Sequence, residues 1–216
     1  MKDGAYILAY DMGTTSVKTC LYYIHSEIEL VASASEGYPL NVLSNGGAEQ
    51  NPEDWWNAVC LTTKQVIGES GISPSSVAGI SFCTQMQGLV LVDEKGVPVR
   101  PAMNYMDQRA GKELKKGMSH GLKIDGCNVF KLAKSLVITK AVAASAKDPV
   151  WKYKWVEKHE PDLFSKVRYW LDVKEYLIHR CTGEFVMTAD SAFSTMLYDI
   201  RKGRKCKSPS MCKMYG

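Results

Sequence analysis

A carboxylate, a glycine and three hydroxyl groups stand close together near the start of the chain. The cluster consists of Asp11, Gly13, Thr14, Thr15 and Ser16. Loop N–H groups and hydroxyls can donate hydrogen bonds to phosphate oxygens, and a carboxylate can hold a hydrated Mg²⁺. These residue types therefore favour a phosphate-binding loop, although a polar turn without a ligand uses the same residues. The loop is not a Walker A motif, because the chain has no Gly-x4-Gly-Lys-Ser/Thr segment.

The elements around this cluster predict a β-hairpin with the cluster at its tip. Apolar runs rich in β-branched and aromatic residues cover residues 6–10 and 17–24, as expected for two paired strands. Residues 28–38 read as a third strand, which gives an antiparallel meander. Asn51 then predicts a helix cap before Pro52 and two acidic residues. We expect that helix to bury one face and to stop near Gly68.

The rest of the chain mixes short strands with helices. Residues 77–82, 89–92 and 167–171 are expected strands, and residues 109–116, 129–146, 149–159 and 173–181 are expected helices. The sequence therefore predicts an α/β protein with a sheet at its centre. Helical spacing places most of the five tryptophans in the core, and the four histidines match no catalytic pattern. A further helix is expected to begin at residues 208–209.

Composition and charge exclude several classes of protein. The 216 residues are 45% hydrophobic and 23% charged, which is ordinary for a soluble globular protein. The formal net charge is +4, but residues 201–216 contain six Lys or Arg and no acid, so the remainder carries 21 positive and 23 negative side chains. The body therefore lacks the basic footprint of a nucleic-acid-binding protein.

Cysteine spacing and hydropathy indicate the cellular compartment in which the protein is expected. The seven cysteines are scattered and never spaced as Cys-x2-Cys, which favours a reducing environment over a zinc site or a disulfide framework. Residues 71–92 are uncharged, but Pro74 and several polar residues argue against a membrane span. The first apolar run is too short for a signal peptide. We expect a cytoplasmic protein without a membrane or nucleic-acid partner.

Four segments taken in order resemble the FGGY carbohydrate kinases, and the xylulokinases among them most closely. They are residues 11–18, residues 49–56 (Glu-Gln-Asn-Pro-Glu-Asp-Trp-Trp), residues 85–110 from Gln-Met-Gln-Gly to Asp-Gln-Arg-Ala, and residues 171–191. The resemblance implies a ribonuclease-H-like domain of the actin/hexokinase type, with a mixed sheet flanked by helices. It also implies ATP-dependent phosphorylation of a sugar hydroxyl, with ATP and Mg²⁺ as cofactors and a ketopentose such as xylulose as substrate.

The same resemblance divides the chain and leaves one role unfilled. Residues 1–200 match the family's N-terminal domain, and residues 201–216 form a basic segment that leads toward a C-terminal domain absent from this chain. In the family that second domain supplies the adenine pocket and the aspartate that accepts the hydroxyl proton. We therefore assign no catalytic residue here and expect the chain by itself to be inactive.

Site residues follow from the matched motifs. The phosphate side is assigned to Asp11, also the magnesium ligand, with Gly13, Thr14, Thr15, Ser16 and Lys18. The sugar side is assigned to Gln85, Met86, Gln87, Tyr105 and Asp107. Gln87 stands where the family has His, but it keeps a donor and an acceptor. Lys18 alternatively faces solvent, Gln85 alternatively braces its loop, and Asp107 alternatively caps a helix that starts at Gln108.

Two other classes of protein share parts of this pattern. A non-catalytic sugar- or nucleotide-binding regulator could use the same scaffold, and the two classes differ in whether the C-terminal part supplies an aspartate in the proton-accepting position. An actin-like ATPase shares the phosphate hairpin but has no use for the segments around Met86 and Asp107. A homodimer is compatible with the sequence.

Overall fold

The computed structural model describes residues 4–118, 121–125, 127–199 and 204–205. The chain divides into two compact units, each built from two stretches of sequence. Unit 1 comprises Met1–Leu40 and Asn51–Gln85, and unit 2 comprises Asn41–Gln50 and Met86–Gly216. The sequence predicts no boundary inside residues 1–200, whereas the backbone passes between the units three times.

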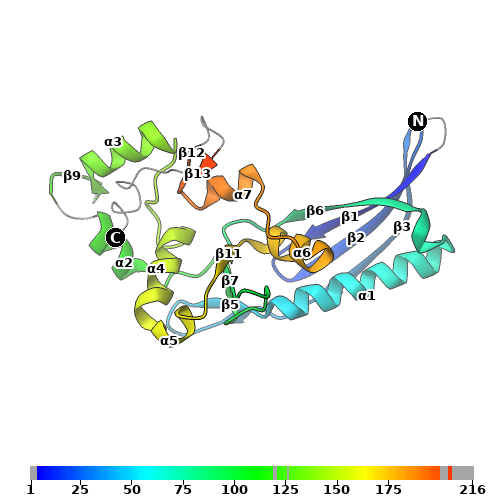
Figure 1. The fold of residues 1–216 in the computed structure, drawn as a ribbon, viewed down its shortest axis with the longest axis horizontal. Coiled ribbons are helices and arrows are strands. Elements are labelled where there is room, and N and C mark those ends of the chain that lie inside the picture. The colour runs from blue at the N-terminus through cyan, green and yellow to red at the C-terminus, as the bar shows by residue number, and fades with distance from the viewer. Residues whose placement is uncertain (1–3, 119–120, 126, 200–203, 206–216) are drawn as a thin grey trace. The chain divides into compact units, whose positions relative to one another are not determined.

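Unit 1 is built on a four-stranded mixed sheet with the order β3-β2-β1-β6. Its strands are β1 (Ala5–Met12), β2 (Ser16–Ile24), β3 (Ile28–Gly37) and β6 (Val77–Thr84). β1, β2 and β3 form the expected antiparallel meander, and β6 runs parallel to β1. The long helix α1 (Pro52–Ser70) lies along this sheet (Figure 1), and a short 3₁₀ turn, η1 (Pro74–Ser76), leads into β6.

The sequence predicts the start of α1 correctly but not its end. Asn51 caps the helix by accepting a hydrogen bond from the Glu53 N–H at 3.2 Å. The helix passes through Gly68 to Ser70 and ends at Gly71, whose φ of 67° gives the left-handed cap that glycine favours. The expected buried face is present. It contains Trp55, Val59, Thr62 and Val66.

Unit 2 holds several small sheets. β4 (Asn41–Val42), β5 (Ala48–Gln50) and β8 (Ala102–Met103) form one, and β7 (Val90–Val92) pairs with β11 (Tyr169–Leu171). β9 (Lys123–Ile124) pairs with β10 (Cys127–Asn128), and β12 (Tyr198–Asp199) pairs with β13 (Arg204–Lys205). Its helices are α2 (Gly111–Met118), α3 (Val129–Ile138), α4 (Pro149–His159), α5 (Pro161–Phe164), α6 (Val173–Thr182) and α7 (Ala189–Ser194).

Two helices of unit 2 depart from expectation, and two agree with it. α2 begins at Gly111 rather than residue 109, and α3 ends at Ile138 rather than residue 146. α4 has its expected bounds, and α6 ends at the expected glycine cap, Gly183. Trp55 and Trp151 are fully buried, while the other three tryptophans are partly buried. The helix expected from residue 208 lies outside the described residues.

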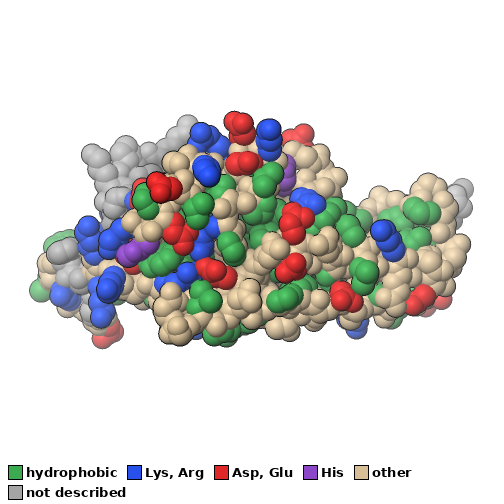
Figure 2. Space-filling model, turned by 90° about the horizontal axis from the view of Figure 1, so that it is seen from below, with side chains coloured by type: hydrophobic (Ala, Val, Ile, Leu, Met, Phe, Trp, Pro, Cys, Tyr) green, Lys and Arg blue, Asp and Glu red, His purple; other side chains and the backbone are tan. Residues whose placement is uncertain are grey.

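Surface charge, helix length and the state of the cysteines can be compared with the classes of protein considered from the sequence. On the face in Figure 2, acidic and basic side chains lie among hydrophobic and neutral ones over most of the surface. No helix within the described residues is long and apolar enough to cross a bilayer. The cysteines at positions 20, 60, 83, 127 and 181 are free thiols.

Candidate functional site

The hairpin of β1 and β2 presents its tip to solvent. Met12 and Val17 are the last buried pair across the two strands. One step back, Asp11 lies opposite Lys18, and both side chains are exposed. In the part of the chain that the structure describes, no side chain forms an ion pair with the Asp11 carboxylate. Binding of Mg²⁺ by Asp11 remains a prediction.

The tip is held in shape by Tyr38, which sequence reasoning missed. Its hydroxyl shares one proton between the Gly13 and Ser16 carbonyls, at 2.7 and 2.8 Å. The backbone N–H of Tyr38 also donates to the Thr15 carbonyl at 2.9 Å. Burial, with the nearby charge of Asp11, raises the pKa of the Tyr38 hydroxyl. The hydroxyl therefore stays protonated and continues to donate.

Contacts within the loop shape the hairpin tip, and two of its three hydroxyl residues are exposed. Gly13 donates its N–H to the Ser16 carbonyl at 2.9 Å, and a Cβ at Gly13 would lie 3.3 Å from that oxygen. Thr15 and Ser16 are exposed, and Thr14 is half-buried. No group of three His, Cys, Asp or Glu among the described residues could enclose a metal ion. A magnesium ion at Asp11 would therefore take its other ligands from waters and phosphate oxygens, as Mg²⁺ commonly does.

The Met86–Gly88 segment begins unit 2, and Asp172 clamps its backbone. The Asp172 carboxylate accepts hydrogen bonds from the N–H groups of Gln87 at 3.0 Å, Gly88 at 2.9 Å and Val173 at 2.8 Å. Gln87 has a φ of 63°, an uncommon backbone conformation for a residue other than glycine. A Cβ at Gly88 would lie 2.7 Å from Asp172 Oδ1, so a side chain there would disturb the clamp. Burial raises the pKa of Asp172 to about 6, although the N–H groups of Val173 and Gly88 and the charge of Lys152 favour the ionised form.

Asp107 is fully buried, and its carboxylate is bonded within the protein. It accepts from the Ala48 N–H at 2.9 Å and from the Arg109 guanidinium at 2.7 Å. It also accepts from the Arg109 N–H at 3.1 Å, which closes a local turn, but α2 begins only at Gly111. The expected helix start at Gln108 is therefore wrong. Sugar contact by Asp107 remains a prediction.

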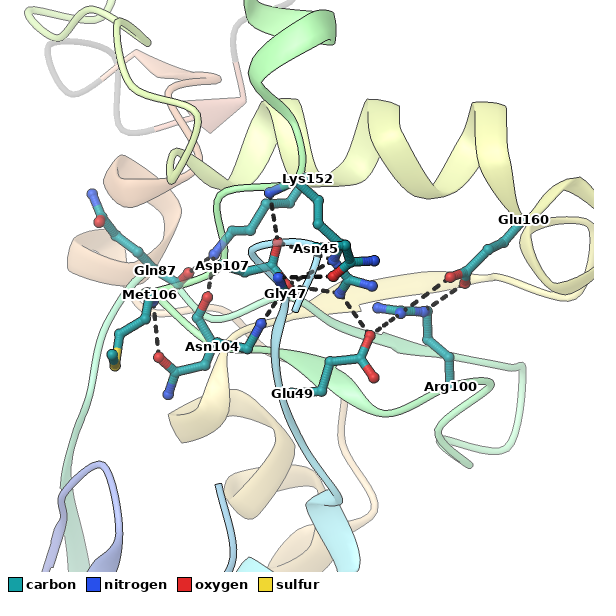
Figure 3. A network of polar contacts seen from close by, with 12 residues as sticks. Asn45, Gly47, Glu49, Gln87, Arg100, Asn104, Met106, Asp107, Lys152 and Glu160 are labelled. Carbon is teal, nitrogen blue, oxygen red and sulfur yellow. Dashed lines mark hydrogen bonds and ion pairs between the residues drawn. The ribbon is translucent and has the colours of Figure 1, made fainter. Parts of the chain in front are cut away.

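Asp107 belongs to a buried network of charges, shown in Figure 3. Glu49 Oε1 accepts hydrogen bonds from both Arg100 and Arg109, each at 2.6 Å. Glu160 binds the Arg100 Nε at 2.7 Å, and the Arg109 guanidinium lies 4.4 Å from the Trp155 ring centroid. Arg109 thus braces Asp107 and has a structural role. The network joins β5, α4 and the two loops on either side of β8.

The predicted site residues fall into two groups. The hairpin tip, Lys18 and Gln85 lie in unit 1, where the Gln85 N–H donates to the Met12 carbonyl at 2.8 Å. Met86, Gln87, Tyr105 and Asp107 lie in unit 2. Met86 is 47% exposed and Tyr105 is also exposed, and the Gln87 side chain points away from the charge network (Figure 3). Gln87 is half-buried.

Sequence reasoning missed three residues that hold these segments in place. Tyr38 supports the hairpin tip, whereas Asp172 and Lys152 support the Gln87 backbone. Asp172 carried a recognisable signal, since Asp directly before a helix is a common cap. The sequence signal for Lys152 was weaker. It follows the buried Trp151, but the same helix also has lysines at less buried positions, so nothing marks Lys152 as different from them.

Comparison with known proteins places the chain in a family. Residues 6–216 match the N-terminal domain of the FGGY family of carbohydrate kinases. Xylulose kinase from Bacillus subtilis is 30% identical over 211 residues, which cover 98% of this chain and 39% of that protein. Gluconokinase from the same organism is 27% identical over 199 residues, which cover 91% of this chain and 36% of that protein.

Solved structures agree on the fold. Gluconate kinase from Lactobacillus acidophilus superposes with a TM-score of 0.82 at 24% identity, over 99% of this chain and 40% of that chain. Xylulose kinase from Rhodospirillum rubrum gives 0.82 at 23% identity, over 97% of this chain and 41% of that chain. The chain thus spans about two fifths of the length of these relatives. The actin/hexokinase-type fold is confirmed, and the chain belongs to the FGGY family of carbohydrate kinases, whose N-terminal domain it matches.

Proposed function

We propose that the protein carrying this chain transfers a phosphoryl group from ATP to a sugar hydroxyl, and that the sugar is a ketopentose such as xylulose. The observation that carries the proposal is the 30% identity to a xylulose kinase across 98% of the chain. The matched gluconokinases make an aldonate the main rival substrate. We expect the protein to act in the cytoplasm.

The hairpin tip takes the phosphate side of this reaction. Thr14, Thr15 and Ser16 would donate to phosphate oxygens, and the exposed carboxylate of Asp11 would hold Mg²⁺. Bound Mg²⁺ supplies positive charge that stabilises the phosphates of ATP. Because the transition state of phosphoryl transfer spreads charge over oxygens, positioned donors contribute most of the protein's share. Lys18, exposed opposite Asp11, adds positive charge beside the same phosphates.

The segments around Met86 and Tyr105 take the sugar side. Met86 and Tyr105 present exposed apolar surface, and Gln87 offers an amide that can both donate to and accept from sugar hydroxyls. Asp107 is fully buried, so its part in sugar binding is to fix the loop that carries Tyr105. Gln85 braces the preceding backbone. We assign the proton-accepting aspartate and the adenine pocket to a C-terminal domain beyond these residues.

The substrate is tested with the complete protein and a panel of ketoses, polyols and aldonates. ADP formation is followed in a coupled assay with Mg²⁺ and ATP. We expect the highest kcat/KM with xylulose, and no turnover by the 216-residue chain by itself. Sugar binding without any turnover would instead favour the non-catalytic regulator, and turnover confined to gluconate would reassign the sugar.

Gln87 is tested by replacement with Ala. Loss of its amide removes a hydrogen bond to a sugar hydroxyl, so we expect the sugar KM to rise roughly tenfold with an unchanged ATP KM. Gln65→Ala is the matched control, since Gln65 is an exposed residue of α1 that bonds Glu69. An unchanged sugar KM in the Gln87 variant would remove this residue from the sugar site.

A further inference from the structure

Lys152 is a buried lysine whose ammonium group reaches two separate loops. It lies in α4 and has no exposed surface. Its Nζ donates to the Gln87 carbonyl at 2.5 Å and to the Asn104 carbonyl at 3.0 Å. Figure 3 shows the side chain extending from α4 to both oxygens. One cation therefore joins the backbone at residue 87 to the backbone at residue 104.

Each of these carbonyls lies next to predicted sugar-site residues. Gln87 is itself one of them, and its peptide is held from the other side by Asp172. The Asn104 carbonyl also accepts from the Asp107 N–H at 3.1 Å, and the Asn104 side chain accepts from the Met106 N–H at 2.9 Å. The Nζ of Lys152 thus lies where the Met86–Gly88 and Asn104–Asp107 segments come together.

A buried ammonium is costly unless anions and acceptors surround it. Three carboxylates stabilise the charged form of Lys152, those of Asp107, Asp172 and Asp148, while the Arg109 guanidinium opposes it. Burial nevertheless lowers the pKa of Lys152 to about 8. The side chain is therefore charged in most molecules at neutral pH and loses its proton in mildly alkaline solution.

We propose that Lys152 is a positioning residue for the sugar site. It fixes the spacing of the Met86–Gly88 and Asn104–Asp107 segments, and it sets sugar affinity without contacting the sugar. The inference rests on the proposed sugar kinase function. It goes beyond that function by assigning control of sugar affinity to a residue that lies outside every matched binding motif.

The test is Lys152→Met in the complete protein, because methionine keeps the length of the side chain but donates no hydrogen bond. Two charge-assisted bonds are lost, so we expect the sugar KM to rise roughly 10- to 100-fold, with the ATP KM within about twofold of wild type. Lys154→Met is the matched control. Lys154 lies on the same helix, forms a surface pair with Glu157 and remains partly exposed, so its loss should change neither KM.

The pH profile separates positioning from general structural support. Since a neutral amine donates weaker hydrogen bonds than an ammonium, sugar affinity in the wild type should fall several-fold above pH 8. The Lys152→Met variant should lack this alkaline decline, whereas Lys154→Met should keep it. An unchanged sugar KM in folded Lys152→Met, or an equal rise in both KM values, would overturn the inference.

Wild-type calorimetry decides the matter if Lys152→Met does not fold. Preferential sugar binding to the ammonium form requires net proton uptake on binding at pH 8.5 and little uptake at pH 6.5. Binding without proton uptake at either pH would refute the inference. A wild-type protein that neither binds nor phosphorylates any sugar of the panel would refute the proposed function and the inference together. An active wild type with pH-independent sugar affinity would refute the inference and leave the function standing.

Discussion

Replacing Tyr38 by Phe removes a single oxygen atom from beneath the hairpin tip. That hydroxyl holds the Gly13 and Ser16 carbonyls at 2.7 and 2.8 Å. Ser16 keeps the hydrogen bond from the Gly13 N–H at 2.9 Å, so the Gly13 carbonyl bears most of the loss. One shared hydrogen bond in a largely buried position contributes about 1–2 kcal/mol to the free energy of unfolding.

The same free energy should appear in nucleotide binding. If the loop must be ordered again when ATP binds, a loss of about 1–1.4 kcal/mol raises the ATP KM roughly five- to tenfold. The sugar KM should remain within about twofold, because both acceptors of the Tyr38 hydroxyl belong to the hairpin loop. Urea unfolding measures the stability, and steady-state kinetics of the complete protein measures both KM values.

Tyr10→Phe is the matched control for this variant. Its hydroxyl pairs with Thr63 Oγ1 at 2.7 Å, in the same unit but on α1 rather than on the hairpin loop. We expect a comparable loss of stability with an unchanged ATP KM. The reasoning fails if both variants raise the ATP KM equally, or if Tyr38→Phe alters neither stability nor nucleotide kinetics.

Three further predictions concern residues of unit 2. Glu49→Gln removes the charge shared by two buried arginines and should lower the free energy of unfolding by about 2–3 kcal/mol in urea titrations; a change below about 0.5 kcal/mol would contradict this. Gly88→Ala brings a Cβ to 2.7 Å from Asp172 Oδ1, so the coupled assay should show a several-fold higher sugar KM and an unchanged ATP KM. The folded pKa of Asp172, about 6, lies above its ordinary 3.8, so this residue should make stability fall by about 2 kcal/mol as pH rises from 4 to 6. Asp172→Asn should flatten that decline, and an identical pH dependence in both proteins would disprove the assignment.

Local signals were sufficient for the elements that begin or end at distinctive residues. The hairpin followed from two apolar runs around a glycine-containing loop, and α1 followed from Asn51 and Pro52. In both cases the backbone N–H and C=O groups find hydrogen-bond partners among residues close by in the sequence, so a short segment is enough to predict the element. The strand order of the full sheet was not predicted, because the parallel pairing of β1 with β6 joins strands that are far apart in the sequence.

The end of α3 depended on contacts that local spacing does not contain. Apolar periodicity continued to residue 146, but the Ala143 carbonyl accepts from the Trp151 indole N–H at 2.9 Å. The Thr139 hydroxyl bonds the Ser135 carbonyl at 3.0 Å, and Lys140 turns the chain with a φ of 60°. Packing against α4 therefore overrides the helical pattern after Ile138.

For the candidate site, too, the sequence predicted the local features and missed those that depend on distant contacts. Motifs identified the loops, because their residue types are distinctive at short spacing. The supports could not be identified in this way, since Lys152 bonds a carbonyl 65 residues earlier and Glu49 bonds an arginine 60 residues later. Nothing in the local sequence pairs such residues, and charge by itself predicts a solvated side chain.

The Glu-Gln-Asn-Pro motif marks a place where the backbone leaves one unit for the other. Its first half, Glu49 and Gln50, is bonded to side chains of residues 100–109, while its second half starts α1. A gene shortened after codon 85 would therefore leave residues 41–50 without their partners. The Glu49 carboxylate would lose the arginines that neutralise it, and the Gln50 amide would lose its bond from Asn104. Neither unit can be excised by a single cut, and a minimal version of unit 1 needs a short artificial bridge from Leu40 to Asn51.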